Sequence, residues 1–238
     1  SRAKEKRNDM SRMFLIDGKP MKTWNVWVGC RFECTYCNAR KAALTRFKHF
    51  ARYKDGFTPK LVEEEMTRHF KPGQFIFVAY MGDIAFATRE QFLRILARIR
   101  DFPQTDFLIQ SKNPKQFYDW REDWGIALPP NVYPGTTIES NRDYGLTKAP
   151  PPIERFRYLT GYPHNRKFLS IEPIMDFDLE ELVRWVTLMN PDIIEVGADN
   201  YHNNLPEPPW SKVEQLLGKL REICPNVVEK EGLERLRG

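Results

Sequence analysis

Short apolar runs alternate with amphipathic helical patterns along most of the 238 residues. Each run reads as a strand covered on both faces and ends near a glycine, a serine or an acidic residue. The runs span residues 23–29, 74–82, 106–112, 131–140, 166–173 and 191–198. Helical patterns span residues 58–70, 88–102, 178–190 and 209–223. This order predicts an α/β fold of parallel strands, either a doubly wound sheet or a complete or incomplete barrel.

We expect one domain over residues 23–238, because the proline-rich stretch 148–156 has the character of an internal loop and not of a boundary. The basic segment 1–22 before it should be partly flexible. No run of about 18 apolar residues occurs, so neither a transmembrane helix nor a membrane partner is expected. Four cysteines in 238 residues do not form a disulfide framework, which predicts reduced thiols and a cytoplasmic location.

Three of the four cysteines crowd into the stretch "GCRFECTYCNAR", directly after the first predicted strand. Cys30, Cys34 and Cys37 give three ligands, whereas a zinc site and a [4Fe–4S] cluster both have four positions to fill. The fourth cysteine, Cys224, lies far along the chain in the last predicted helix. Zinc would need His49 or another residue as its fourth ligand. The pattern therefore favours an iron–sulfur cluster in which one iron is open to an external ligand.

The spacing C-x3-C-x2-C, with Tyr36 before the last cysteine, resembles the radical S-adenosylmethionine (SAM) superfamily. The stretches "TWN", "TTIESNRD", "LSIEPI" and "IIEVGAD" resemble an uncharacterised branch of it, common in phages and prokaryotes and distantly similar to the DNA-repair enzyme spore photoproduct lyase. The resemblance implies a partial (β/α)6 TIM-like barrel that binds a [4Fe–4S] cluster and SAM. The reduced cluster would cleave SAM to a 5′-deoxyadenosyl radical, which abstracts a substrate hydrogen.

The resemblance also implies a SAM site at the carboxyl ends of the strands. The stretch "MGD" would hold the SAM amine, and the stretch "QSKN" would hold the SAM carboxylate. The stretch "TTIESNR" would bind the ribose and the carboxylate, and the stretch "VGA" would support the adenine. The expected cofactor-binding residues are Tyr36, Gly82, Asp83, Ser111, Lys112, Glu139, Ser140, Arg142 and Gly197.

Polar residues at the last two strand ends are expected to face the substrate. Glu172 ends the fifth run, and Tyr201 and His202 follow the sixth. A tyrosine or histidine near the radical could relay a hydrogen atom or a proton, so these three residues are the catalytic candidates. The lyase carries a cysteine hydrogen donor beside its second strand, but the matching stretch here, "YMGDIA", has none. Repair of thymine dimers is therefore not expected, although Tyr80 could take a related role.

The segment 40–54 interleaves seven basic residues with three aromatic residues. Basic groups hold phosphates and aromatic rings stack on bases, so this segment suggests a nucleotide or nucleic-acid substrate, consistent with the net charge of +5. A reducing partner such as flavodoxin or ferredoxin is also implied. Two alternatives stay open: a radical SAM enzyme acting on a peptide or small metabolite, and a metal-stabilised nucleic-acid-binding module without catalysis.

Overall fold

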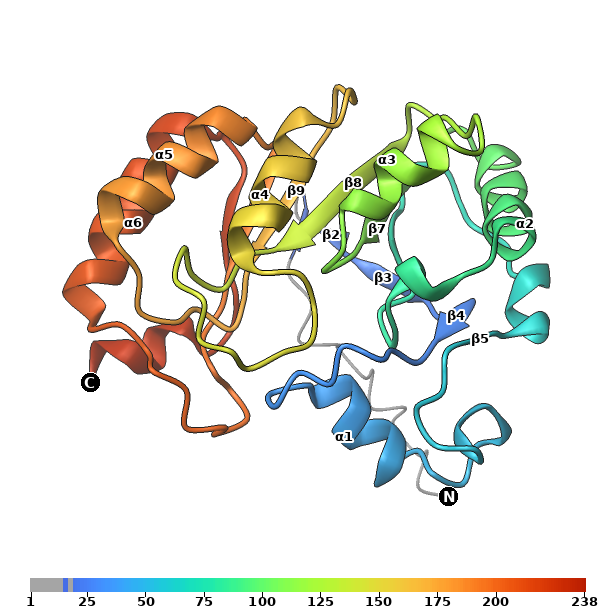
Figure 1. Ribbon diagram of the computed structural model, residues 1–238, viewed down its shortest axis with the longest axis horizontal. Coiled ribbons are helices and arrows are strands. Elements are labelled where there is room, and N and C mark those ends of the chain that lie inside the picture. The colour runs from blue at the N-terminus through green and yellow to red at the C-terminus, as the bar shows by residue number, and fades with distance from the viewer. Residues whose placement is uncertain (1–14, 17–18) are drawn as a thin grey trace, which may run out of the picture.

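A curled, all-parallel sheet of seven strands forms the centre of the computed structural model, which describes residues 15–16 and 19–238 (Figure 1). Its strand order is β11-β10-β9-β8-β7-β6-β3. The expected partial TIM-like barrel is confirmed, with a seventh strand beyond the six predicted runs. The strands are β3 (Lys22–Trp24), β6 (Phe75–Val78), β7 (Asp106–Gln110), β8 (Val132–Thr137), β9 (Phe168–Ile171), β10 (Ile193–Val196) and β11 (Val227–Glu229).

Five α-helices follow the outer arc of the sheet (Figure 1). They are α2 (Arg89–Arg100), α3 (Lys115–Glu122), α4 (Pro152–Gly161), α5 (Leu179–Met189) and α6 (Trp210–Ile223). The short α1 (Asn38–Leu44) lies apart from this arc, below the sheet in Figure 1. Within the described residues, no helix has the length and apolar composition that crossing a membrane requires.

Most of segment 1–22 lies outside the described residues. Its described part holds β1 (Leu15–Ile16) and β2 (Lys19–Pro20), which pair antiparallel. The described residues also form four 3-10 turns: η1 (Ala51–Tyr53), η2 (Glu63–Thr67), η3 (Ile84–Phe86) and η4 (Leu233–Arg237).

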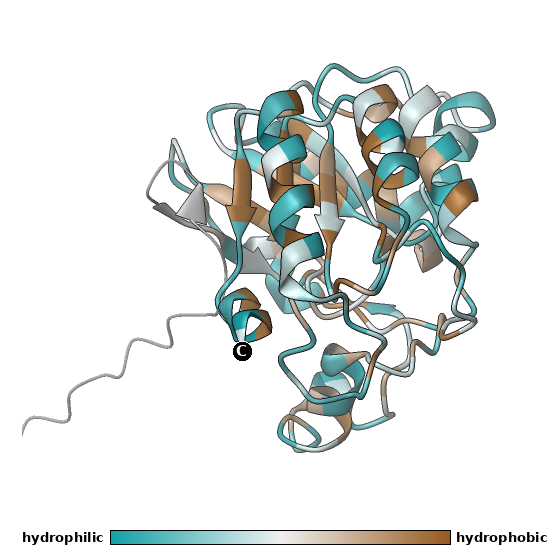
Figure 2. Cartoon of the chain, turned by 90° about the vertical axis from the view of Figure 1, so that its left-hand side faces the viewer, coloured by the Kyte–Doolittle hydropathy of each residue, from teal (hydrophilic) through white to brown (hydrophobic). Residues whose placement is uncertain are grey.

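Alternating side chains give the sheet two different faces. Residues such as Ile76, Phe107 and Ile194 point outward into the main core, where the helices cover them with their apolar sides (Figure 2). Their neighbours point inward and form a smaller apolar layer inside the curve, near the amino ends of the strands. This inner layer consists of Met21, Phe75, Leu108, Phe168 and Ile193. The half-barrel is therefore filled at one end, which leaves the carboxyl ends of the strands for a site.

The helix predicted over residues 58–70 is wrong. The segment instead forms β5 (Lys60–Leu61), antiparallel to β4 (Trp27–Val28), and then η2. The backbone N–H of Val62 extends this pairing by donating to the carbonyl of Val26 at 2.8 Å. The first predicted run, 23–29, divides between β3 and β4. Because β4 is not part of the main sheet, its backbone groups need another partner, and pairing with β5 outweighs the helical propensity of segment 58–70.

Candidate cofactor site at the carboxyl ends of the strands

The cysteine loop rests directly on the end of β6 through a main-chain contact. Gly29 donates its N–H to the carbonyl of Met81 at 3.0 Å, and its own carbonyl accepts from Asp83 at 3.1 Å. Gly29 has φ +84°, and a Cβ there would lie 2.3 Å from the carbonyl oxygen of Thr58. A Cβ on Gly82 would lie 2.8 Å from the backbone nitrogen of Gly29. The two glycines are therefore required for this approach.

The three cysteines of the loop are free thiols, each partly exposed. The Sγ of Cys30 accepts a hydrogen bond from the N–H of Phe32 at 3.4 Å. The Sγ of Cys37 accepts from the N–H of Arg40 at 3.3 Å and caps α1. Burial is the main cause that raises the pKa of both thiols, so binding of a metal cluster would displace protons from them.

Three thiols on one loop, with backbone N–H groups donating to two of them, match the donor set of an iron–sulfur cluster. The fourth cysteine, Cys224, caps the end of α6 and is buried in the main core. The part of the chain that the structure describes holds no group of three or more His, Cys, Asp or Glu side chains arranged to hold a metal ion. The ring of His49 packs against that of Phe50 in a tilted arrangement, with ring centroids 4.4 Å apart.

A loop after β8 packs on the cysteine loop from the other side. Thr35 donates its N–H to the carbonyl of Leu146 at 3.0 Å, and Lys148 donates to Phe32 at 2.7 Å. The hydroxyl of Thr147 lies 3.1 Å from the Sγ of Cys34. This loop therefore places a hydroxyl beside the thiol of Cys34, whereas the other two thiols accept from backbone N–H groups.

Glu139, at the end of β8, is the centre of a buried charged network beside the cysteines. Its Oε1 accepts from the hydroxyl of Tyr36 at 2.5 Å and pairs with the ammonium of Lys112. Its Oε2 accepts from Arg155 of α4 at 2.8 Å. Glu139 is 4% exposed and Arg155 only 1%. The structure thus brings together three predicted cofactor residues and adds a fourth member, Arg155.

Electrostatics fixes the protonation of this network. Burial by itself raises the pKa of Glu139, but Lys112 and Arg155 outweigh it and lower the pKa to about 2. Burial, together with the Glu139 carboxylate, raises the pKa of Tyr36, so its hydroxyl stays protonated and donates. With two cations and one anion, the network has one positive charge left over. Such a surplus suits an anionic group of a ligand.

Two further predicted residues lie beneath Lys112. Asp83 is buried, and its Oδ1 accepts from the Ser111 hydroxyl at 2.7 Å and from Ala85 N–H at 3.0 Å. Its Oδ2 accepts from the backbone N–H of Lys112 at 2.9 Å. Burial raises the pKa of Asp83. These bonds tie the end of β6 to the end of β7 and hold Lys112 in place, while direct contact of Asp83 and Ser111 with a cofactor stays a prediction.

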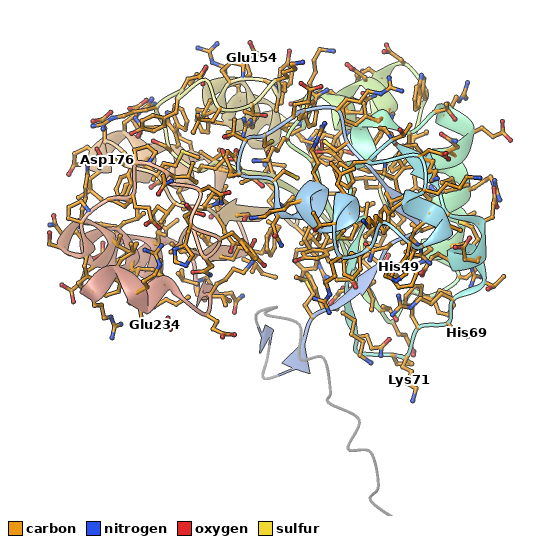
Figure 3. The ribbon with its side chains drawn as sticks, turned by 90° about the horizontal axis from the view of Figure 1, so that it is seen from below. His49, His69, Lys71, Glu154, Asp176 and Glu234 are labelled. Atoms are coloured by element: carbon orange, nitrogen blue, oxygen red, sulfur yellow. The ribbon has the colours of Figure 1, made fainter. Side chains whose placement is uncertain are left out.

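Ser140 and Arg142 are engaged with a neighbouring loop. The Ser140 hydroxyl donates to the carbonyl of Asp176 at 2.6 Å. The guanidinium of Arg142 pairs with Asp176 at 2.5 Å and with Asp178 at 2.6 Å. Figure 3 labels Asp176. The predicted contacts of Ser140 and Arg142 with SAM would therefore compete with these bonds.

A small cavity of about 20 Å³, enough for about one water molecule, adjoins the network. Its lining joins the network to the loop that reaches Cys34. The lining residues include Tyr36, Glu139, Thr147, Arg155 and Met175.

The predicted catalytic residues occupy the next strands along the sheet. Glu172, after β9, forms an ion pair with Lys230, and a Cβ on Gly197 would lie 2.7 Å from its Oε1. Tyr201 and His202 follow β10 in an exposed turn, and His202 has φ +54°. The structure thus brings Glu172 and Gly197 into contact and sets Tyr201 and His202 at the surface. Their catalytic roles stay predictions.

The sequence interpretation missed Arg155, although a signal for it exists. Arg155 lies on the apolar stripe of α4, with Pro152, Phe156 and Leu159. A buried arginine on such a stripe requires a partner, which here is Glu139. Thr147, in a loop without periodicity, carries no comparable signal.

A family model described as a protein of unknown function (DUF5131) matches residues 20–212. The chain belongs to the DUF5131 family. The match extends from the first strand of the sheet to the first turn of α6, so it includes the cysteine loop and the charged network. No curated protein matches the chain.

Solved structures of spore photoproduct lyase share the fold of this DUF5131 member. A double mutant of that enzyme with bound AdoMet and dinucleoside spore photoproduct has a TM-score of 0.57 and 9% identity, over 93% of this chain and 79% of that one. The lyase complexed with dinucleoside spore photoproduct has a TM-score of 0.57 and 8% identity, over 87% and 75%. At such identities the likeness concerns the fold.

Proposed function

We propose that this protein is a radical SAM enzyme that modifies a nucleotide or a nucleic-acid base. The observation that carries the proposal is the set of three free thiols beside the charged network of Tyr36, Lys112, Glu139 and Arg155. When bound, a reduced [4Fe–4S] cluster would supply one electron for the cleavage of SAM to methionine and a 5′-deoxyadenosyl radical, which would take a hydrogen atom from the substrate. A low-potential flavodoxin or ferredoxin in the cytoplasm would deliver that electron.

The residues of the chain have distinct roles in this proposal. Cys30, Cys34 and Cys37 would hold three irons, and SAM would bind the fourth. Lys112 belongs to the network that has one surplus positive charge, and it is the side chain best suited to the SAM carboxylate. Glu139, held ionised by its two cationic partners, orients Lys112 and Tyr36, and its position at the strand end suits a hydrogen bond from a ribose hydroxyl.

The substrate class rests on the surface next to the cysteine loop and on the fold. Several basic or aromatic side chains of segment 40–54 are exposed, and the segment includes α1, onto which Figure 3 looks. They are Lys41, Arg46, Lys48, His49, Phe50 and Lys54. Solved proteins with this fold bind a dinucleoside photoproduct, which supports a nucleic-acid base over a peptide or small metabolite.

The enzyme class is tested by anaerobic reconstitution. Protein loaded with iron and sulfide and reduced with dithionite is expected to cleave SAM to 5′-deoxyadenosine, which liquid chromatography detects. Protein without iron is the control. A reduced protein that holds about four irons per chain, as a cubane has, and yet forms no 5′-deoxyadenosine would support the non-catalytic binding module instead.

The nucleic-acid substrate is tested by the salt dependence of binding. The double variant Arg46→Ala and Lys48→Ala is expected to bind single-stranded DNA more weakly and to lower the slope of log K against log salt by about 1.4, because each lost phosphate contact is worth about 0.7. Fluorescence anisotropy measures both quantities. Lys219→Ala, an exposed lysine on α6, is the matched control. Equal slopes in all three proteins would argue for a peptide or metabolite substrate.

A further inference from the structure

A polar layer lines the inside of the half-barrel, one step above the inner apolar layer. Leu108, Phe168 and Ile193 belong to the inner apolar layer, so residues two positions further along the same strands also point inward. Hydrogen bonds join these polar side chains across the strands. The layer consists of Gln110, Thr137, Ser170, Glu195 and Lys230.

The bonding within the polar layer is incomplete. Gln110 donates to the Thr137 hydroxyl at 2.8 Å, and Ser170 donates to the Oε1 of Glu195 at 2.6 Å. Within the described residues, the Oε1 of Gln110 and the Oε2 of Glu195 are buried and have no hydrogen-bond partner. Glu195 is only 3% exposed. A buried acceptor without a donor is costly, so the Oε1 of Gln110 points to a ligand or to ordered water, while the Oε2 of Glu195 faces the ammonium of Lys230.

Lys230 lies between two carboxylates at this point. Its ammonium pairs with Glu172 and lies 3.6 Å from the Oε2 of Glu195. The side chain of Glu195 is 4% exposed, that of Lys230 13% and that of Glu172 26%. Glu195 therefore lies behind the ion pair of Lys230 and Glu172. The more exposed Lys230 and Glu172 present one hydrogen-bond donor beside one acceptor to a ligand. Gly197 leaves the room that the Glu172 side chain occupies.

Two tyrosines border this cluster where it meets solvent. Tyr80 follows β6, Tyr201 follows β10, and each is 41% exposed. Burial raises the pKa of Tyr80, and the charges of Lys230 and Glu172 and the nearby Tyr201 contribute smaller effects, so Tyr80 lies close to the cluster. Exposed aromatic faces beside a cluster of polar groups suit a planar ring.

The charge of the cluster restricts the ligand. One ammonium faces two carboxyl groups, so the cluster has no surplus positive charge with which to attract a phosphate. A nucleobase edge, in contrast, alternates N–H donors with carbonyl or ring-nitrogen acceptors and carries no charge. Phosphates would instead stay outside, at the basic side chains of segment 40–54, as in enzymes that take a base out of its stack to modify it.

We propose that Lys230 and Glu172 read the hydrogen-bonding edge of a nucleobase inside the half-barrel, with Glu195 fixing Lys230 from behind and Tyr80 and Tyr201 contacting the ring. Lys230 donates to an acceptor on the base, and Glu172 accepts from a neighbouring N–H. This inference rests on the proposed function, because it names the substrate subsite of that enzyme.

The test measures binding of the four homo-dinucleotides by isothermal titration, without reductant, so no SAM cleavage is required. For the dinucleotide that binds most tightly, methylation of the base on its pairing-edge N–H is expected to weaken binding to the wild type about 10-fold to 100-fold, since the carboxylate of Glu172 loses its donor. Glu172→Gln and Lys230→Met should weaken binding of the unmodified dinucleotide by a similar factor. Lys219→Met is the matched control.

Several outcomes would overturn the inference. The first is that no dinucleotide binds at millimolar concentration. The second is that the methylated dinucleotide binds as tightly as the unmodified one. The third is that spermidine binds more tightly than every dinucleotide. If Lys230→Met lowers the salt slope for single-stranded DNA, Lys230 contacts a phosphate and the assignment is wrong. The methylated dinucleotide is compared with the unmodified one on the wild-type protein alone. This part of the test therefore remains valid even if a variant does not fold. SAM cleavage, measured separately, distinguishes failure of this subsite from failure of the proposed enzyme class.

Discussion

Cys34→Ala is expected to lose both its iron and its ability to cleave SAM. Three thiols are all that the loop offers, and Cys224 is buried in the main core, so no described cysteine can replace the missing ligand. Iron per chain after anaerobic reconstitution should fall from about four to near zero. Formation of 5′-deoxyadenosine should fall to the level of iron-free protein. Colorimetric iron determination and chromatography measure the two effects.

Cys224→Ala is the matched control, because it also removes one thiol but leaves the loop intact. It should keep the iron content and the cleavage of the wild type, at a modest cost in stability from the small cavity it creates. The ligand assignment fails if Cys34→Ala keeps wild-type cleavage, or if the loss follows Cys224 instead.

Arg155→Met is expected to weaken both the fold and SAM binding. The change leaves the carboxylate of Glu139 with Lys112 and Tyr36 alone, and removes the donors to the carbonyls of Thr137 and Pro150. Breaking a buried ion pair from one side should lower the free energy of unfolding by about 3 kcal/mol. The surplus positive charge also disappears, so SAM affinity should fall about tenfold or more. Urea denaturation and calorimetric titration of the reconstituted protein measure these effects.

Arg157→Met provides the comparison on the same helix, because Arg157 is an exposed residue of α4. It should change the unfolding free energy by less than about 0.5 kcal/mol. A similar, small effect of both changes would mean that the charged network contributes little. A loss of stability without a loss of SAM affinity would limit Arg155 to a purely structural role.

The fold was predictable because its signal repeats along the chain. Runs such as 106–112 and 191–198 have near-continuously apolar centres, and only parallel strands covered by helices explain several such runs in order. Segment 58–70 misled the prediction because its caps and acidic residues favour a helix locally. Its pairing with Val26 and Trp27 depends on a partner more than 30 residues away, which local propensity does not report.

The candidate site was predictable at its strand ends and less so elsewhere. Lys112 and Glu139 lie at the carboxyl ends of predicted strands, so their meeting at one edge of the sheet could be expected. Their pairing with each other, in place of two separate ligand contacts, could not, because a strand pattern gives no distance between side chains. Lys230 lies after a strand that the sequence interpretation did not identify, and its partnership with Glu172 was therefore hidden.

The contact between Gly29 and Gly82 has a consequence for how such a protein can diverge. The cysteine loop is anchored through main-chain atoms, so its height above the sheet does not depend on the identity of the surrounding side chains. Substitutions can accumulate around the anchor while the thiols stay in place, provided both glycines remain. An architecture that tolerates sequence drift in this way is compatible with a shared fold at 9% identity.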